Sequence, residues 1–336
     1  MKAVGYRKNL PINAPKALED VDLPAPVPGP RDLLVRVHAV SVNPVDTKVR
    51  AASAPAAGEV KVLGWDAVGV VEAVGPQASG FAVGDRVWYA GAIKRPGANS
   101  ELHAVDARIV SKAPKSLSDA PAAALPLTAI TAWELLFDRL RIAEGGGEGQ
   151  TLMVVGGAGG VGSILIQLAR QLTKLRVIAT ASRPESREWC LELGAHAVID
   201  HSKPLSQALR SAGIEHVDYV ASLTQTGSHY QEIIQSLKPQ GALAVIDDME
   251  GLDPIALKSK SLSLHWELMF TRSMFETPDM QEQGVLLRRV ADLVDSGRVK
   301  TTANAAFGRI NAENLIRAHA LIESGKTVGK IVLEGF

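Results

Sequence analysis

The residues with the clearest chemical meaning in this 336-residue chain form a glycine-rich segment, Gly157-Ala158-Gly159-Gly160-Val161-Gly162. In the pattern Gly-x-Gly-x-x-Gly, the glycines permit a tight turn, close approach of the backbone to a pyrophosphate, and close packing of a helix on a strand. Thr151–Val155 before the segment is apolar like a strand, and a helical pattern begins at Ser163. The segment is therefore expected to present a helix N-terminus to phosphate groups, although a tight turn that binds nothing is the alternative. The predicted phosphate-binding residues are Gly157, Gly159, Gly160, Val161 and Gly162.

The end of the next strand indicates which dinucleotide binds. A site that selects NAD usually has Asp or Glu there, to accept hydrogen bonds from the ribose 2′-hydroxyl. This chain has Ser182 and Arg183 instead, with Arg187 one turn later. An acid would repel a 2′-phosphate, whereas an arginine can bind one through a forked, charge-assisted contact. These three residues predict NADPH as the cofactor, and the alternative is that both arginines only solvate a surface helix.

The predicted elements place this loop in an alternating α/β region. The first third of the chain has short Val-rich segments separated by Gly and Pro, which favours a barrel or sandwich. From Pro126 onward, apolar strands alternate with amphipathic helices, as in a parallel sheet built from βαβ units. Ser182 and Glu185 are expected to form a capping box on a helix over residues 184–193. Two further helices, over 281–295 and 312–324, and a final strand over 330–333 complete the chain.

The net charge, the apolar region and the cysteine content of the chain argue against several classes of function. Lys+Arg and Asp+Glu are balanced at 36 each, so charge gives no reason to expect a nucleic-acid or anionic-membrane partner. The most apolar region, residues 122–133, is interrupted by Pro126 and two threonines, and we expect it to be too short and broken to cross a bilayer. No signal peptide is recognisable, and the single cysteine, Cys190, excludes an intrachain disulfide framework. A cytoplasmic location is expected.

Several longer segments make the chain recognisable. They are Val42-Asn43-Pro44-Val45-Asp46, Gly64-Trp65-Asp66-Ala67-Val68-Gly69, Gly84-Asp85-Arg86-Val87, Leu127-Thr128-Ala129-Ile130-Thr131-Ala132, the glycine-rich segment, and the ending from Gly329 to Phe336. Over nearly its whole length the chain resembles the medium-chain dehydrogenase/reductase superfamily, in its quinone-oxidoreductase-like branch, and most of all the zinc-type alcohol dehydrogenase-like proteins.

This resemblance implies a Rossmann doubly wound parallel sheet, inserted in a GroES-like β-barrel catalytic domain that is built from both ends of the chain. We expect the barrel domain over residues 1–125 and 266–336, and the NADPH-binding domain over residues 126–265. Family members are often dimers, so a homodimer is expected, with the segment over 262–270 as the joining strand.

The chain departs from the zinc-dependent members of this family. They carry a Cys ligand in the region of Asn43–Asp46 and a Gly-His-Glu sequence where this chain has Gly64-Trp65-Asp66. Zinc needs three protein ligands, generally His, Cys or carboxylate, and Trp65 cannot be one. The four closely spaced cysteines of the structural-zinc lobe are also absent, and Cys190 lies in the other half of the chain. We therefore predict that no metal takes part.

By family position, Asn43, Asp46, Trp65 and Asp66 are expected near the nicotinamide, and Thr128 near the cofactor. Tyr89 is a candidate proton donor. Each has a simpler alternative, because Asp66 and Asn43 suit turns, while Trp65 and Tyr89 suit core packing. The resemblance thus implies an enzyme that transfers hydride from NADPH to quinones or α,β-unsaturated carbonyls, with a small molecule as its substrate. A zinc-type alcohol or aldehyde dehydrogenase and a non-catalytic NADPH-binding redox sensor remain as alternatives.

Overall fold

The computed structural model describes residues 1–336, which divide into two compact units. The first unit comprises Met1–Ile130 and Phe270–Phe336, and the second comprises Thr131–Met269. The sequence predicts divisions after residues 125 and 265, whereas the structure divides the chain after residues 130 and 269. The first division falls inside helix α3 (Pro126–Trp133), so the change of pattern at Pro126 marks the start of that helix.

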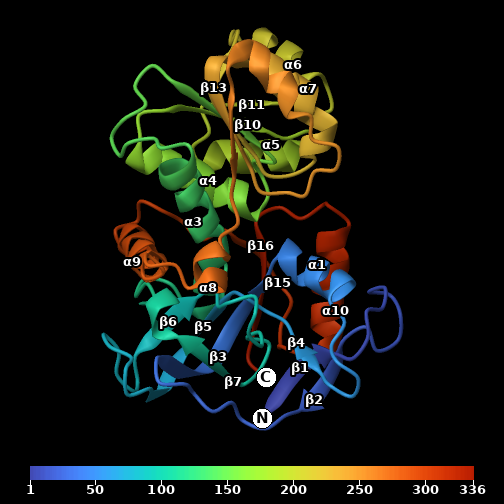
Figure 1. The fold of residues 1–336 in the computed structure, drawn as a ribbon, viewed down its shortest axis with the longest axis vertical. Coiled ribbons are helices and arrows are strands. Elements are labelled where there is room, and N and C mark those ends of the chain that lie inside the picture. Colours follow the sequence, from blue (N-terminus) through green and yellow to red (C-terminus); the bar gives the residue numbers. More distant parts are fainter. The chain divides into compact units, whose positions relative to one another are not determined.

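The second unit contains a six-stranded sheet in the order β11-β10-β9-β12-β13-β14, with every neighbouring pair parallel. Its strands are β9 (Thr151–Val155), β10 (Arg176–Thr180), β11 (Ala197–Ile199), β12 (Val217–Ser222), β13 (Leu237–Val245) and β14 (Ser263–Trp266). Its helical segments are η2 (Glu134–Arg139), α4 (Gly160–Leu172), α5 (Pro184–Glu192), α6 (Leu205–Ser211), α7 (Thr226–Ser236) and η3 (Pro254–Lys260). This strand order is that of the doubly wound dinucleotide-binding fold, which confirms the predicted fold class. Figure 1 shows its strands among helices α4 to α7.

Burial on both faces explains why these strands read as continuous apolar runs. All five residues of β9 are buried, as expected for the central strand of a parallel sheet covered by helices. Met153, Ile178, Val220 and Leu243, from four adjacent strands, share one core. Because parallel strands end at the same edge, the loops that follow β9, β10, β12 and β13 all lie at the carboxyl edge of the sheet.

The predicted capping box at helix α5 is wrong. The helix begins at Pro184, so its N-cap is Arg183, and no side-chain capping bond is present. A capping box pairs the N-cap with the third helical residue, but Ser182 precedes the N-cap and Glu185 is the second helical residue. The Ser182 side chain is exposed and is not used as a cap.

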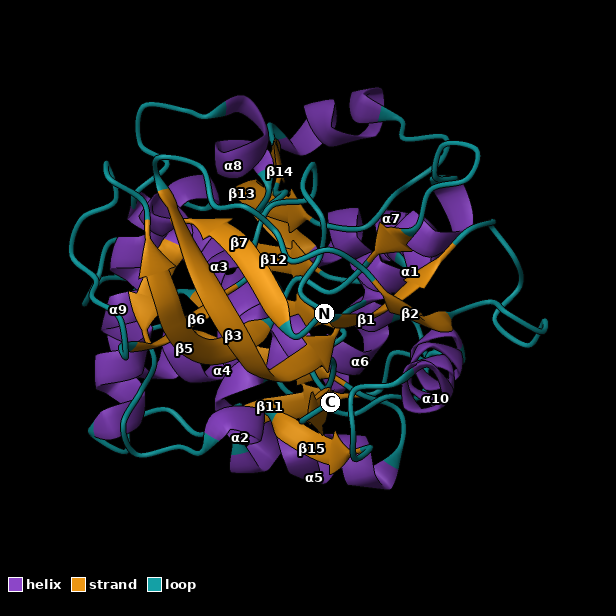
Figure 2. Cartoon of the chain, turned by 90° about the horizontal axis from the view of Figure 1, so that it is seen from below, coloured by secondary structure: helices purple, strands orange, loops and turns teal.

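The first unit is mainly β-structure. Strands β2-β1-β4 form one sheet, and the path β15-β16-β3-β5-β6-β8, with β7 paired to β3, forms a seven-stranded sheet. The long strand β3 (Asp32–Val42) pairs with β5, β7 and β16, and Figure 2 shows β3, β5, β6 and β7 running side by side. The other strands are β1 (Lys2–Tyr6), β2 (Glu19–Asp22), β4 (Lys61–Val62), β5 (Ala67–Val74), β6 (Arg86–Tyr89), β7 (Leu102–Asp106), β8 (Val110–Lys112), β15 (Ala303–Ala306) and β16 (Lys330–Glu334). Because β16 comes from the end of the chain, both ends build this unit.

Short helices connect and flank these sheets. They are α1 (Pro44–Ala52), η1 (Ala107–Ile109), α2 (Asp119–Ala123), α8 (Thr271–Phe275), α9 (Glu282–Asp295) and α10 (Ala312–Glu323). Helices α9 and α10 start and end within one residue of the segments predicted from the sequence. At α9, Gly284 has no room for a side chain, because a Cβ there would lie 2.7 Å from the Arg108 carbonyl oxygen. The helix therefore packs with its backbone directly against η1.

The apolar region around residues 122–133 is longer in the structure than the sequence suggests. Helical structure runs over Asp119–Arg139, which is 21 residues and enough by length and composition to cross a membrane. Ala124 and Leu125 interrupt this run between α2 and α3, and Pro126 occupies the first position of α3, where proline is tolerated. However, 83% of the most apolar window is buried inside the protein, as in the core helix of a globular domain.

Candidate functional site

The glycine-rich segment joins β9 to α4 at the carboxyl edge of the parallel sheet. Gly160 and Val161 are the first two residues of α4, and Gly159 is its N-cap. Gly162 cannot carry a side chain, since a Cβ would lie 2.4 Å from the Gly156 carbonyl oxygen. A Cβ on Gly157 would lie 2.7 Å from that of Ala179. These two glycines are required by the packing of the loop on its own strand and helix.

Gly159 differs from these two glycines. A Cβ there would meet only the Gly156 carbonyl oxygen, at the ordinary contact distance of 3.5 Å. Its φ of −72° is also accessible to any residue. Neither backbone conformation nor packing within the protein therefore requires glycine at this position. The open space lies at the N-terminus of the 13-residue helix α4, which has no side-chain cap. The first N–H groups of a helix have no partner within the helix itself. The loop fits a phosphate group bound against the backbone.

The residues predicted to bind a 2′-phosphate lie directly after β10, at the same edge. Ser182 is exposed, and the Arg183 side chain is 39% exposed, with its Nε 3.5 Å from the Glu185 carboxylate. An exposed pair of this kind is weak, so the guanidinium can exchange it for a phosphate. Arg187 donates a hydrogen bond of 3.4 Å to the Ala181 carbonyl. No carboxylate stands at the end of β10 itself, where an acid would select NAD.

Two residues at this edge were not predicted from the sequence. Thr180, the last residue of β10, accepts a hydrogen bond through its Oγ1 from the Gly156 N–H at 3.1 Å, which fixes the start of the glycine-rich loop. His201, in the loop after β11, lies with Nδ1 3.3 Å from the same Oγ1 atom. Their positions at the carboxyl ends of two consecutive strands, Thr180 in β10 and His201 two residues after β11, are the signal that could have identified them.

Most of the residues expected near the nicotinamide meet in one buried network of the first unit. The Asn43 amide donates to Asp66 Oδ2 at 2.8 Å, and the Leu127 N–H donates to Asp66 Oδ1 at 2.7 Å. Lys330, the first residue of β16, donates through Nζ to Asn43 Oδ1 at 2.5 Å and to Asp66 Oδ2 at 2.9 Å. None of Asn43, Asp66 and Lys330 is more than 3% exposed. Lys330 is the member that sequence analysis missed, although it lies in the recognised ending of the chain.

Asp46 extends this network into helix α1. Its carboxylate accepts hydrogen bonds from the backbone N–H groups of Asn43, at 2.7 Å, and Gly64, at 2.9 Å. Burial raises the pKa of Asp46 to about 7, against the opposing effect of these hydrogen bonds and of the Lys330 charge. The bonds to Asp46 fix the backbone on both sides of the network. The contact of Asn43, Asp46 and Asp66 with a nicotinamide stays a prediction.

Trp65 and Tyr89 are fully buried neighbours of this network. The Trp65 indole donates to the Ala92 carbonyl at 3.3 Å, and its ring meets Phe270 edge to face at 6.0 Å. The Tyr89 hydroxyl lies 3.1 Å from Nδ1 of His103, whose Nε2 is 2.9 Å from the Pro96 carbonyl oxygen. A carbonyl only accepts, so Nε2 carries the proton, and Nδ1 must accept a hydrogen bond from Tyr89.

The charge states around Tyr89 agree with this assignment. Burial lowers the pKa of His103 to about 4, so its ring is neutral, and burial raises the pKa of Tyr89 well above its usual range. The Tyr89 proton is therefore directed to His103, and its transfer to a substrate stays a prediction. Thr128, in α3, is 2% exposed and donates through Oγ1 to the Leu125 carbonyl at 3.1 Å, so its proximity to a cofactor is also still a prediction.

These residues do not fit a zinc centre. Trp65 offers no metal ligand, and the oxygens of Asn43 and Asp66 that could serve contact the ammonium group of Lys330. A fixed positive charge at that place opposes a second cation. Nowhere in residues 1–336 do three His, Cys, Asp or Glu side chains converge as metal ligands.

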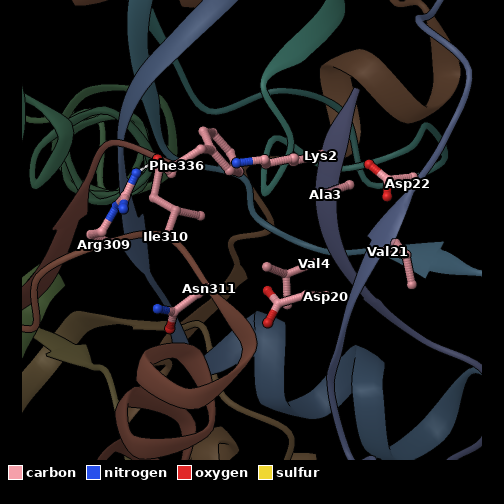
Figure 3. A pocket seen from close by; sticks show the side chains of 10 residues that line it. All are labelled: Lys2, Ala3, Val4, Asp20, Val21, Asp22, Arg309, Ile310, Asn311 and Phe336. Atoms are coloured by element: carbon pink, nitrogen blue, oxygen red, sulfur yellow. Dashed lines mark hydrogen bonds between the residues drawn. The ribbon is translucent and has the colours of Figure 1, made fainter.

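Two surface hollows of the first unit contain none of the predicted site residues. One, of about 350 Å³, lies where the ends of the chain meet, and Figure 3 shows its lining side chains from β1, β2 and the C-terminal segment. There Asp20 accepts the N–H of Ala312 at the start of α10, and Arg309 bonds the carbonyl of Phe336. The other, of about 600 Å³, lies between α9, η1 and the loop over residues 77–81. Both hollows belong to the first unit, whereas the dinucleotide loop belongs to the second.

Comparison with known proteins agrees with this arrangement. Residues 29–115 match the alcohol dehydrogenase GroES-like domain, and residues 193–333 match the zinc-binding dehydrogenase family. A zinc-type alcohol dehydrogenase-like protein of Staphylococcus aureus (strain MSSA476) is 39% identical over 336 residues, which cover 99% of each chain.

Solved structures extend the same relationship. A structure from Rhizobium etli CFN 42, provisionally named a zinc-dependent alcohol dehydrogenase, is 54% identical with a TM-score of 0.96, covering 100% of this chain and 98% of that one. The quinone oxidoreductase of Pseudomonas syringae pv. Tomato DC3000 is 27% identical with a TM-score of 0.83, covering 99% of both chains. The chain is thus an oxidoreductase that belongs to the medium-chain dehydrogenase/reductase superfamily, among the zinc-type alcohol dehydrogenase-like proteins.

Proposed function

We propose that this protein is an NADPH-dependent reductase that transfers hydride to quinones or α,β-unsaturated carbonyls without a catalytic metal. The observation that carries the proposal is the open space at Gly159, in front of the uncapped N-terminus of α4, which neither packing nor backbone conformation explains. Ser182 and Arg183 follow β10 at the same edge of the sheet, with no acid at the strand end to select NAD.

Different residues of the chain would bind different parts of the cofactor. The N–H groups at the start of α4 would hold the pyrophosphate, and Arg183, with Ser182 and Arg187 beside it, would hold the 2′-phosphate. NADPH, when bound, supplies the hydride. The buried network of Asn43, Asp46 and Asp66 would fix the backbone near the nicotinamide, as family position implies.

The proposed hydride acceptor follows from the lack of a zinc donor set among these residues. An acceptor that takes hydride at carbon moves an electron pair onto its oxygen, which then takes a proton. Zinc would stabilise that negative charge, but Asn43, Trp65 and Asp66 do not form a zinc donor set. Quinones and enones spread the charge by conjugation and so demand less of the protein. The similarity to a quinone oxidoreductase supports the same class of acceptor.

We further propose a homodimer joined through β14. This strand is the last in its sheet and pairs only with β13. Trp266, its last residue, and Leu268, two residues further along the chain, are each 50% exposed. An exposed strand edge with apolar neighbours is suited to pairing with a second copy. Sedimentation should give twice the chain mass, and a monomer with unchanged NADPH affinity would contradict this assembly.

A metal-free assay tests the proposed function. The protein is purified with a chelator, its zinc content is measured by elemental analysis, and oxidation of NADPH and NADH is followed with quinones, enones, aldehydes and alcohols as separate panels. Chelator-resistant turnover of quinones or enones with NADPH is expected. Stoichiometric zinc with alcohol oxidation would overturn the proposal, and tight NADPH binding without turnover would favour a redox sensor.

A further inference from the structure

Two buried glutamates in the second unit face one arginine. Glu134, at the start of η2, is 1% exposed, and Glu267, directly after β14, has a fully buried side chain. Arg139 donates through Nε to Glu267 Oε2 at 2.7 Å, and its Nη2 lies 3.9 Å from Glu134 Oε2. The Glu134 carboxyl lies within hydrogen-bonding reach of the Glu267 carboxyl. The Arg139 guanidinium therefore lies close to both carboxyl groups.

The backbone of η2 brings these groups together. The segment is π-helical over Glu134–Arg139, and the Leu140 N–H bonds the Leu135 carbonyl, five residues back. A turn of an α-helix takes about 3.6 residues, so residues five apart point to different sides. In an i→i+5 turn they lie on nearly the same side. This turn allows Glu134 and Arg139 to face Glu267 together.

One oxygen of the pair lacks a donor. Glu267 Oε1 is buried and has no hydrogen-bond partner. Two ionised carboxylates only accept hydrogen bonds, so neither can satisfy the other. A single proton on Glu134 turns that carboxyl into a hydrogen-bond donor toward the Glu267 carboxyl. Burial also raises the pKa of Glu267 from its ordinary range, and two adjacent buried carboxyl groups cannot both ionise cheaply.

The other charged groups around the pair do not replace that proton. Asp138, on η2, adds a negative charge that further raises the pKa of Glu267. Burial lowers the pKa of His265, on β14, as do the charges of Arg141 and Arg139. Arg139 donates to Glu267 Oε2, and none of these groups bonds Glu267 Oε1.

The pair stands at the edge of the sheet where dinucleotides bind. The Glu267 N–H donates to the carbonyl of Val245, the last residue of β13, at 2.9 Å. Because β9 and β12 to β14 are all parallel, Glu267 lies at the same carboxyl edge as the loop over residues 157–162. Ligands of such sheets bind outside the carboxyl ends of the strands.

We propose that Glu134 and Glu267 share one proton, and that this closed pair positions the carboxyl ends of β13 and β14 for the nicotinamide half of the cofactor. The proposal rests on the proposed function. Loss of the proton leaves two adjacent carboxylates beside one arginine, and their repulsion moves the segment that follows β14. Both glutamates are positioning residues, which act on the cofactor through the strand ends.

Glu134→Gln tests this role, because an amide supplies an N–H donor in place of the shared proton but cannot lose it. In the unaltered protein, NADPH affinity should fall by at least about tenfold as pH rises through the titration of the pair. In Glu134→Gln the affinity should stay level across the same range. The infrared difference spectrum between the unaltered protein and Glu134→Gln at neutral pH should contain the carbonyl band of the carboxyl that carries the shared proton. A band from Asp46, whose pKa is about 7, is common to both proteins and cancels. Glu148→Gln, at a side chain that is 81% exposed, should change neither measurement.

Two outcomes would overturn the proposal. They are the absence of a carboxyl band from the difference spectrum, and the same pH dependence of NADPH affinity in both proteins. If Glu134→Gln fails to fold, Glu267→Gln is used, since its amide can donate to the Glu134 carboxylate in the reverse direction. Absence of NADPH binding at every pH would overturn the proposed function together with the positioning role, whereas the infrared band tests the shared proton by itself.

Discussion

The ammonium group of Lys330 lies 2.9 Å from the carboxylate of Asp66, and these two buried residues are separated by 264 positions in the chain. Lys330 begins the last strand, and Asp66 precedes β5 in the first part of the same unit. Asn43 completes the contact by bonding both partners. The two ends of the chain are thus tied by a buried ion pair at the place where zinc-dependent relatives have metal ligands.

Removing Lys330 should strongly destabilise the protein. Lys330→Met leaves Asp66 as a buried charge without its partner, and losses of this kind are about 3–5 kcal/mol in the free energy of unfolding. The double variant Lys330→Met/Asp66→Asn should recover part of that loss, because the uncompensated charge is gone. Urea unfolding at pH 7 measures both variants, with Lys203→Met at an exposed position as the control. A loss below about 1 kcal/mol for Lys330→Met would contradict the role of the pair.

Two glycine variants should separate binding from folding. Gly159→Ala meets no steric obstacle in the protein, so its free energy of unfolding should change by no more than about 0.5 kcal/mol. Its methyl group occupies the space assigned to the pyrophosphate, so NADPH affinity should fall by more than about tenfold. Gly162→Ala places a Cβ 2.4 Å from a carbonyl oxygen and should lose stability as well. Calorimetric titration measures NADPH affinity, and thermal unfolding measures stability. Unchanged NADPH affinity in Gly159→Ala would contradict the proposed phosphate site.

Arg183→Ala should lower the affinity for NADPH and leave that for NADH unchanged. A hydrogen bond to a charged group contributes about 1.5–3 kcal/mol, which corresponds to a loss of roughly 10- to 100-fold. Arg176→Ala is the matched control, because Arg176 is an exposed arginine at the opposite end of the same strand, β10. Dissociation constants for both dinucleotides, measured by fluorescence, test this prediction. An equal loss for NADPH and NADH would show that Arg183 does not recognise the 2′-phosphate.

Acid should destabilise the protein partly through His319. This histidine is fully buried in α10 with both ring nitrogens unpartnered, and burial, with the charge of Arg50, lowers its pKa from 6.5 to about 3. Between these values the unfolded chain binds a proton that the folded chain does not. The contribution of neutral His319 to the free energy of unfolding is therefore complete above pH 6.5. It is lost as pH falls, by up to about 1.4 kcal/mol per pH unit. His103, whose pKa burial lowers to about 4, acts in the same direction.

His319→Leu should make the free energy of unfolding less dependent on pH. Leucine has a similar size and binds no proton. The slope of the free energy of unfolding against pH, between pH 6.5 and 4, should therefore fall by about 1.4 kcal/mol per pH unit, which is the value for one proton. Urea unfolding at a series of pH values measures the slope, and His216→Leu, at a partly exposed position before β12, is the control. Parallel curves for the unaltered protein and His319→Leu would show that His319 does not titrate in this way.

The features that sequence alone determined are local in the chain. The glycine-rich loop, the strand before it and the helix after it span adjacent residues, so spacing and periodicity predict their geometry directly. The same holds for the alternation that gives the parallel sheet and for Ser182 and Arg183, whose place after β10 follows from counting along one βαβ unit. The capping box failed on a shift of one residue, because Pro184 fixes the first position of α5 and so makes Arg183 the N-cap.

The remaining features were decided by tertiary structure, because they join residues that the sequence separates. No local pattern brings Lys330 to Asn43 and Asp66, or makes Tyr89 a donor to a neutral His103. The buried pair of Glu134 and Glu267 depends on a π-helical turn and on the order of strands in the sheet. Charge states and hydrogen-bond partners follow from burial and neighbours, and both are properties of the packed chain that spacing along the sequence does not contain.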